Sequence, residues 1–402
     1  MWIKFLLLTF ILSETAFADI INASSASQTD VNTAITSAVA GDTVAVPAGS
    51  ANWSGLSISK AIYLKGAGVG STNITLTGNN TITKQASGVT RISDFSFSKT
   101  SGGNESKGIT IEGSWQSAEP IVIQDCEFTI SATGLFLIDV PGGVIISNCD
   151  FTGDWDDSFI QPKATDGQNS WTTADTFGDR DTDGKLNIYV EDCTFYGGTN
   201  QGIDADDNSR VVYRYNDLTY SSFNTHGWAT SPAGVRHFEV YNNTWHHDGA
   251  STSIANQSWC VWIRGGTGFI YNNSFADIAG GFWGDKDEML FTIRGAEDNR
   301  PQGACGSVSY PVPHQLGQSH NGTTSTTDPI RIYSNTGTAV VGAGWNWGNP
   351  CGLTFTDFWQ EDRDYVLGTA KSGYTAYTYP HPLASITQSA PRINIGTFTI
   401  GP

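Results

Sequence analysis

The chain has 402 residues, and its 39 acidic side chains outnumber its 21 basic ones, which gives a formal net charge of -18. Such an acidic chain disfavours nucleic acid and anionic membranes as partners, because both are polyanions that attract Lys and Arg. With 45 glycines, 12% aromatic residues and only 15% charged residues, the composition is typical of a β-rich extracellular protein with many turns.

The first 18 residues have the pattern of a secretory signal peptide. Lys4 precedes an apolar stretch over 5–12, and residues 16–18 form the small-x-small exit Ala-Phe-Ala. We therefore expect the mature chain to begin near Asp19 and to be secreted. No later stretch approaches the roughly 18 to 20 continuous apolar residues that span a bilayer, so we expect no membrane anchor in the mature chain.

Residues 30–41 predict a short helix near the start of the mature chain. Asp30 suits the N-cap, apolar residues follow at helical spacing, and Gly41 suits the end of the helix. A strand predicted over 43–47 comes directly afterwards. We expect residues 19–50 to form an N-terminal cap, because the first strands of an open sheet otherwise expose unpaired backbone groups.

One eight-residue phrase recurs along the chain and predicts its architecture. The first full copy reads Ile-Val-Ile-Gln-Asp-Cys-Glu-Phe, and every later copy also ends in a bulky residue. The copies span 121–128, 144–151, 188–195, 211–218, 238–245 and 268–275, and a weaker copy ends at Phe97. Their ends lie 23 to 44 residues apart, which predicts a unit of about 23 residues with insertions, the spacing of 44 being nearly two units.

Alternation within each phrase predicts a strand whose Ile123, Cys126 and Phe128 positions face a core. From copy to copy, the middle position of this set holds Cys126, Cys149, Cys193, Asn216, Asn243 and Asn273. We expect these residues to stack in one column, in which the asparagines hydrogen-bond one another and the backbone. The three cysteines are then free and buried, and the one disulfide we expect joins Cys305 to Cys351.

Stacked short strands predict an all-β fold, a single-stranded parallel β-helix, in which residues 19–402 form one domain. Its coils are expected to cover 51–345, with loop insertions near 154–184 and 298–328. Residues 346–402 are rich in aromatics, and we expect them to form an irregular lid over the last coil.

The phrase Ala-Gly-Asp-Thr-Val-Ala-Val-Pro-Ala-Gly after the predicted helix, followed by the stacked Asn-Asn-x-Phe strands, resembles a known group. It is similar to the secreted right-handed parallel β-helix proteins of the pectate-lyase-like superfamily, over roughly residues 28–340. The resemblance implies a right-handed coil and a carbohydrate held along one face. It leaves the reaction open, because the superfamily includes lyases, hydrolases, esterases and non-catalytic adhesins.

Two acidic segments, 179–184 and 204–207, are predicted to form a Ca²⁺ site. Asp181 and Asp204 lie 23 residues apart, as do Asp183 and Asp206, so the repeat places them on adjacent coils. Calcium takes several carboxylate and carbonyl oxygens in a flexible geometry. An acidic turn pair without metal and a catalytic role for the carboxylates are the alternatives. The predicted metal ligands are Asp179, Asp181, Asp183, Asp204 and Asp206.

Cationic residues follow in the later coils. Arg264 and Arg294 lie 30 residues apart, which predicts that they stack and bind a substrate carboxylate or sulfate. Pairing with Asp285, Asp287 or Glu297 is the alternative. The candidate catalytic residues are His226, Arg264, Lys286 and Arg294, and the candidate substrate-binding residues are Arg236, His237 and Asp207.

These residues favour β-elimination from an acidic polysaccharide that contains uronic acid. The enzyme we expect is a Ca²⁺-assisted polysaccharide lyase that acts as a monomer. The reaction needs a cation on the substrate carboxylate and a base for the proton beside it. Hydrolysis is the second hypothesis: the order Asp206-Asp207, His226-Gly227, Arg264 is similar to that of polygalacturonases, although Thr225 and Gly266 depart from their motifs. A non-catalytic, glycan-binding adhesin with a structural calcium ion is the third.

Overall fold

The computed structural model describes the chain from residue 18 to residue 384 with gaps. The described ranges are 18–99, 107–113, 119–130, 136–138, 142–153, 158–163, 180–197, 201–206, 208–225, 235–246, 260–275, 289–292, 316–320, 325–337, 341–344 and 360–384. Within them, no helix is long and apolar enough to cross a bilayer.

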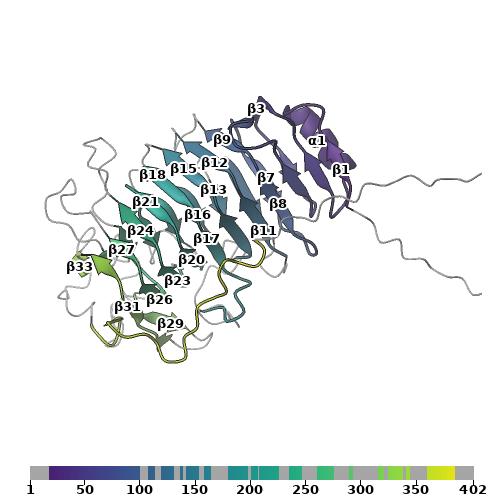
Figure 1. Cartoon of the computed structure of the whole chain (residues 1–402). Coiled ribbons are helices and arrows are strands. Elements are labelled where there is room, and N and C mark those ends of the chain that lie inside the picture. The colour runs from purple at the N-terminus through teal and green to yellow at the C-terminus, as the bar shows by residue number, and fades with distance from the viewer. Residues whose placement is uncertain are drawn as a thin grey trace, which may run out of the picture.

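Three parallel sheets, here called A, B and C, run the length of the molecule (Figure 1). Sheet A has the order β1 (Ile20–Asn22), β2 (Thr43–Ala45), β5 (Tyr63–Lys65), β8 (Thr90–Ser93), β11 (Ile121–Gln124), β14 (Val144–Ser147), β17 (Ile188–Glu191), β20 (Arg210–Arg214), β23 (His237–Tyr241), β26 (Thr267–Tyr271), β31 (Ile330–Tyr333) and β34 (Tyr365–Leu367). Sheet B has the order β3 (Gly49–Trp53), β6 (Thr72–Leu76), β9 (Ser96–Lys99), β12 (Glu127–Ile130), β15 (Asp150–Gly153), β18 (Thr194–Gly197), β21 (Asp217–Thr219), β24 (Thr244–His246), β27 (Ser274–Phe275) and β32 (Thr336–Gly337).

Sheet C has the order β4 (Ser57–Ile58), β7 (Asn80–Thr83), β10 (Ile109–Glu112), β13 (Phe136–Ile138), β16 (Ser158–Pro162), β19 (Gln201–Ala205), β22 (Phe223–Thr225), β25 (Val261–Ile263), β28 (Met289–Thr292) and β33 (Val341–Gly344). A small antiparallel pair, β29 (Gln318–His320) with β30 (Ser325–Thr327), lies outside the three sheets. Each coil passes from sheet C to sheet A to sheet B. The predicted fold, a right-handed parallel β-helix, is confirmed.

A two-residue corner joins sheet A to sheet B in coil after coil. Between β11 and β12 it consists of Asp125 and Cys126. The first corner residue has a positive φ in the left-handed region, a conformation that Asp and Asn tolerate better than other side chains. These corner residues, with φ between 50° and 66°, are Asp94, Asp125, Asn148, Asp192, Tyr215, Asn242, Asn272 and Ser334.

The second corner residue points inward and builds the predicted column. Asn216 donates its amide to Asn243 Oδ1 at 3.0 Å, and Asn243 donates to Asn273 Oδ1 at 3.1 Å. Asn273 donates in turn to Asn335 at 3.0 Å, which extends the column by one residue that the repeat had not indicated. Below the asparagines, Cys126, Cys149 and Cys193 are buried free thiols, as predicted, whereas Cys305 and Cys351 lie outside the described residues.

Phenylalanines stack in the next column of the core. The ring centroids of Phe97 and Phe128 lie 5.3 Å apart, those of Phe128 and Phe151 4.9 Å, and those of Phe151 and Phe195 4.7 Å. Registers such as Phe151 with Phe195 confirm the predicted alignment of the phrases. The spacing of 44 residues that ends at Phe195 is one coil with an insertion and not nearly two units, because β14 pairs directly with β17.

The two ends of the described chain differ in structure. Helix α1 (Gln28–Ser37) lies at the N-terminal end of the coil and contacts β1, β2 and β3, with Val31, Ala34 and Ile35 buried (Figure 1). Its N-cap is Ser27, whose hydroxyl accepts the N–H of Asp30, so the helix begins earlier than the sequence predicted. The described tail, 360–384, first adds β34 to sheet A. It then runs back along the outside of that sheet instead of over the last coil (Figure 1).

The asparagine column predicts a large effect of one substitution. Asn243→Ala removes the acceptor of the Asn216 N–H and the donor to the Tyr213 carbonyl, all of them buried. We expect the free energy of unfolding to fall by about 3 kcal/mol, because buried backbone groups lose their partners. Urea unfolding measures this change.

Asn52→Ala is the matched control, because Asn52 is exposed on the outside of sheet B. We expect it to change stability by less than about 0.5 kcal/mol. Equal losses for the two variants would show that the column does not carry the stability assigned to it.

Candidate functional site

An ion pair lies on the outer side of sheet C, where β19, β22 and β25 are neighbours. In β19, Ile203 and Ala205 belong to the core, so Asp204 between them points to the opposite side of the sheet. Asp204 is in register with Asn224 of β22, which is in register with Trp262 of β25. Parallel pairing thus lines up an acid, an amide and an indole across three coils.

Arg264 completes this group one residue after β25. Its Nη2 lies 3.1 Å from Asp204 Oδ1, and its Nε donates to the Thr225 carbonyl at 2.7 Å. The backbone N–H of Arg264 donates to the Thr225 hydroxyl at 3.0 Å, so Thr225 accepts hydrogen bonds from both the backbone and the side chain of Arg264. The guanidinium also lies 4.5 Å from the centroid of the Trp262 ring. These contacts fix Arg264 beside the acid.

Burial dominates the electrostatics of this group. Arg264 is 1% exposed, and burial lowers the pKa of its guanidinium, while the charges of Asp204 and Asp206 oppose that effect. Nη1 of Arg264 is buried and has no hydrogen-bond partner among the described residues. Nη1 of Arg264 is therefore a candidate donor to an oxyanion, because carboxylates pair with arginine through several N–H donors.

Asp181 and Asp183 lie on a loop that leads into sheet A, whereas Asp206 is buried directly after β19. Leu186 donates its N–H to Asp181 Oδ2 at 2.7 Å, and burial raises the pKa of Asp181. Asp183 is exposed and pairs with Lys185 at 2.9 Å, a hydrogen bond that lowers the pKa of Asp183. Arg210, at the start of β20, is close enough to Asp181 to oppose the rise in its pKa.

The predicted stacking of Asp181 on Asp204 is wrong. Asp181 lies in the loop before β17 of sheet A, whereas Asp204 lies within β19 of sheet C, whose neighbours are β16 and β22. In the part of the chain that the structure describes, no three His, Cys, Asp or Glu side chains converge as metal ligands would. Asp204 is instead neutralised by Arg264. Asp179 lies outside the described residues, so the predicted Ca²⁺ site stays a prediction.

The register between β25 and β28 differs from the 30-residue offset on which the predicted Arg264–Arg294 stacking rested. Ile263 pairs with Phe291, so the offset between β25 and β28 is 28 residues and not 30. Arg264 therefore follows the strand at the level of Thr292. Arg294, Lys286, His226, Asp179 and Asp207 all lie outside the described residues.

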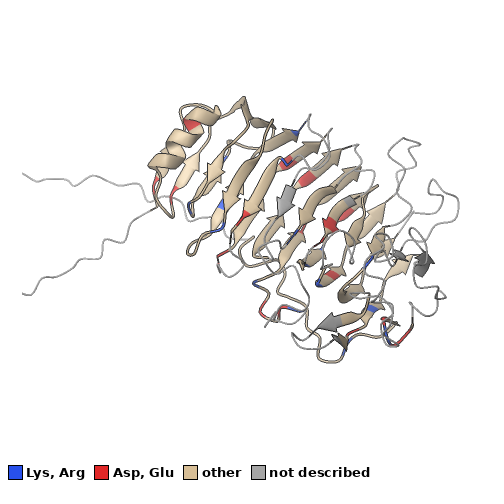
Figure 2. Cartoon of the chain, turned by 180° about the vertical axis from the view of Figure 1, so that it is seen from behind, with Lys and Arg blue, Asp and Glu red and all other residues tan. Residues whose placement is uncertain are grey.

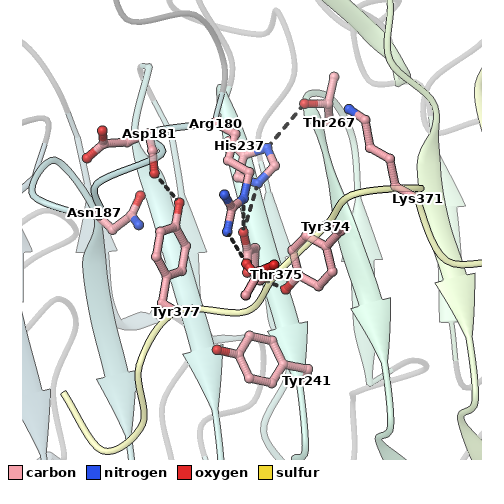
Figure 3. A network of polar contacts seen from close by, with 12 residues as sticks. Arg180, Asp181, Asn187, His237, Tyr241, Thr267, Lys371, Tyr374, Thr375 and Tyr377 are labelled. Atoms are coloured by element: carbon pink, nitrogen blue, oxygen red, sulfur yellow. Dashed lines mark hydrogen bonds and ion pairs between the residues drawn. The ribbon is translucent and has the colours of Figure 1, made fainter.

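His237, predicted to bind substrate, lies on sheet A and not with the Asp204–Arg264 pair on sheet C, and Arg236 lies directly before it. His237 begins β23 of sheet A, is 2% exposed, and has Nδ1 3.3 Å from the Thr267 hydroxyl. Its Nε2 lies 3.5 Å from Glu239, and it belongs to the network of Figure 3 on the outside of sheet A. Arg236 is buried just before β23, and its N–H donates to the Ser209 carbonyl.

Sequence reasoning missed Thr225, Asn224 and Trp262 as members of the site. They do not fall in the recurring phrase, which covers sheets A and B only. The loops on both sides of sheet C vary in length, so the spacing between Asp204, Asn224 and Trp262 follows no period. Only the alternation in Val261-Trp262-Ile263-Arg264, with Trp262 and Arg264 on one side, was available as a signal.

Comparison with known proteins identifies no family. No family model matches the chain, and no curated protein matches it. Among solved structures, the chain is similar to an alginate lyase from Paenibacillus sp. str. FPU-7, with a TM-score of 0.38 and 11% identity. The superposition covers 82% of this chain and 98% of that one. At this identity and TM-score, the similarity says nothing about the substrate of this chain.

The buried ion pair predicts a thermodynamic asymmetry. Asp204→Ala leaves Arg264 charged and buried, so we expect the free energy of unfolding to fall by about 3 to 5 kcal/mol. The double variant Asp204→Ala/Arg264→Met removes both charges, and we expect it to recover more than half of that loss. Chemical unfolding of the three proteins measures the difference.

Asp183→Ala serves as the control, because this exposed carboxylate pairs only with Lys185 among its described ionic contacts. We expect its effect to stay within about 1 kcal/mol. If Asp204→Ala proves equally mild, Arg264 does not depend on Asp204 for its charge compensation.

Proposed function

We propose that the protein is a secreted polysaccharide lyase of the pectate-lyase-like superfamily that cleaves a uronic-acid-containing polysaccharide by β-elimination. The observation that carries the proposal is the buried Arg264 on the outside of sheet C, with Asp204 on one side and Trp262 over it. The signal-peptide pattern of residues 1–18 supports secretion.

Arg264 is assigned to the substrate carboxylate and not to the base. An arginine beside an ionised acid keeps its proton, so it acts as a fixed positive charge. In β-elimination, removal of the proton next to the carboxylate places negative charge on that carboxylate. A preorganised guanidinium in a water-poor site stabilises this charge more strongly than water does.

Trp262 is assigned to the sugar ring. Its side chain is partly exposed while Arg264 beneath it is buried, so the indole is the first part of the group that a ligand meets. An aromatic face beside a carboxylate binder suits a uronate, which combines an apolar ring face with one acidic group. The base is sought among His226, Lys286 and Arg294, which are candidates from the sequence alone.

Hydrolysis is disfavoured for Asp204 and Asp181, whereas Asp206 stays a candidate of the hydrolase hypothesis. A glycosidase needs one carboxyl group that carries a proton for the leaving oxygen. Asp204 is in an ion pair with Arg264 and therefore lacks that proton. Asp181 has a raised pKa, yet it is buried against the tail of the chain on the side of sheet A.

The test is an ultraviolet absorbance assay for unsaturated uronates, with pectate, alginate and glycosaminoglycans as substrates. We expect turnover on one of them and a loss of at least about 100-fold in Arg264→Ala, because a transition-state charge loses its donor. Arg264→Lys keeps the positive charge but lacks the planar set of N–H donors of a guanidinium, so it should recover only part of the activity. Thermal melting shows whether each variant is folded.

Lys371→Ala is the matched control, because it removes an exposed cation far from sheet C that pairs with Asp328. Assays with added calcium and with chelator test the calcium prediction separately. Binding of a polysaccharide without turnover would replace the lyase by an adhesin, and turnover that survives Arg264→Ala would reject the site.

A further inference from the structure

The C-terminal segment 371–384, here called the strap, crosses the outer face of sheet A (Figure 1). At one end, Lys371 pairs with Asp328, which precedes β31, at 2.6 Å. At the other end, the Leu383 carbonyl accepts a hydrogen bond from Arg91 of β8 at 2.8 Å. The strap therefore spans most of the sheet and joins coils that lie far apart in sequence.

The strap supplies hydrogen bonds to a fully buried carboxylate. Glu239 of β23 has a side chain with no exposed surface. It accepts hydrogen bonds from the Tyr374 hydroxyl of the strap at 2.6 Å and from Arg180 Nε at 2.7 Å. Figure 3 shows Tyr374 and Arg180 converging on this point beside His237. Without the strap, Glu239 loses a donor and its cover.

A second buried ion pair depends on the strap in the same way. Arg214 of β20 and Glu191 of β17 lie 2.6 Å apart, and neither side chain has exposed surface. Arg214 also donates to the carbonyls of Tyr377 and Thr378, at 3.0 and 2.8 Å. The N–H of His381 donates to Glu191 at 2.8 Å. The strap backbone therefore supplies hydrogen-bond partners that the Arg214–Glu191 pair would lack without it.

The strap also clamps the acidic loop at 180–187. The Arg180 guanidinium lies 4.3 Å from the ring centroid of Tyr377, and it donates to the Thr375 carbonyl at 2.9 Å. The Tyr377 hydroxyl donates to the Asp181 carbonyl. The Tyr377 ring also packs against Gly184, where a Cβ would lie only 3.1 Å from it. The loop is therefore held between the strap and sheet A (Figure 3).

We infer that residues 371–384 are a strap that holds the acidic loop 180–187 in place and releases it in acid. The device goes beyond the proposed reaction, since it concerns how the outer face of sheet A opens and closes. It rests on contacts that are independent of Arg264 and of any substrate.

Release in acid follows first from the geometry of His381. The Leu383 N–H donates to His381 Nδ1 at 3.2 Å, so the docked ring is neutral at that nitrogen. Protonation of Nδ1 destroys the acceptor and places a second cation beside Arg214. Burial and Arg214 lower the pKa of His381 to about 4. The ring also contacts Tyr189, and its backbone contacts Glu191, on the strand that faces it.

His237 and Glu239 act in the same direction. Burial lowers the pKa of His237, although Glu239 and Asp328 oppose this, and Arg180 supports it. Burial alone would raise the pKa of Glu239, but the hydrogen bonds and charges of His237, Arg180 and the Tyr374 hydroxyl hold it below its usual value.

Lowered pKa values mean that the docked state binds fewer protons than the released state. Docking is therefore fully favoured above about pH 6.5, the value of a free histidine, and weakens as the pH falls through the docked values. Asp181 opposes this trend, because its pKa is raised when the loop is buried. The lowered pKa values of His381, His237 and Glu239 all favour docking at neutral pH, and Asp181 alone among these four groups opposes it.

Hydrogen exchange on the full-length protein tests the inference, with mass spectrometry of peptides covering 371–384 and 180–187. After correction for intrinsic exchange, we expect both segments to lose protection together, by at least about tenfold, between about pH 7 and pH 4. Peptides from β11 and β14 should keep their protection and serve as the internal reference. No substrate is needed, so the result is independent of the lyase assay.

Three variants sharpen the test. Tyr374→Phe removes the hydroxyl donated to Glu239, and at neutral pH it should reduce protection of both segments by about 10- to 100-fold. His381→Asn offers an acceptor that does not titrate, so it should reduce the loss of protection in acid. Tyr196→Phe, at an exposed tyrosine of sheet B, should change nothing.

Two outcomes overturn the inference. If Tyr374→Phe opens the strap while the loop keeps its protection, the strap does not hold the loop. If the strap is equally protected from about pH 7 to pH 4, it does not release in acid.

Discussion

The two-residue corner between sheets A and B is the constraint on which the rest of the structure depends. Its first residue turns the chain through a left-handed conformation, and its second residue points inward to meet its counterpart in the next coil. Because the corner has the same length in successive coils, both flanking strands keep one register along the molecule. Side chains therefore stack on like side chains, and the backbone of each coil is paired by its neighbours.

This constraint also explains how much of the fold could be predicted from the sequence. The columns of Ile123, Cys126 and Phe128 were predictable, because corner and strands form one uninterrupted phrase. The spacing of 44 residues was interpreted wrongly as nearly two units, because a long insertion between sheets C and A lengthens one coil. The end of the asparagine column at Asn335 was hidden by another long insertion, between β27 and β31.

The candidate site was less predictable because it lies on sheet C. Loops of variable length flank this sheet on both sides, so equal spacing in sequence does not mean equal height in the coil. Asp181 and Asp204 lie one repeat period apart, but Asp181 lies in the loop before β17 of sheet A and Asp204 lies within β19 of sheet C. Arg264 was predicted to point outward, and the acidic partners that the sequence suggested for it were Asp285, Asp287 and Glu297. Its partner is Asp204, 60 residues earlier and already assigned to a metal.

Buried carboxylates on the outer faces of sheets A and C are neutralised in the same way. The sequence predicted four aspartates at strand spacing and a divalent cation to neutralise them, but Asp181 does not stack on Asp204. The structure uses arginines from other coils or loops: Arg264 for Asp204, Arg214 for Glu191 and Arg180 for Glu239. On sheet A, the C-terminal strap contributes the remaining hydrogen bonds. Acidic and basic residues therefore lie on separate strands of the coil (Figure 2), and Glu191 of β17 and Arg214 of β20 lie on neighbouring ones.

The thiol column has a consequence for the redox chemistry of the chain. Burial raises the pKa of Cys126 and Cys149, so almost none of either sulfur is present as thiolate, the form that attacks oxidants and disulfides. Once folded, these cysteines are inert even in an oxidising medium. The unfolded chain lacks this protection, because its thiols have ordinary acidity and are open to solvent. Whether Cys126 and Cys149 are oxidised therefore depends on whether the coil forms before an oxidant reaches them.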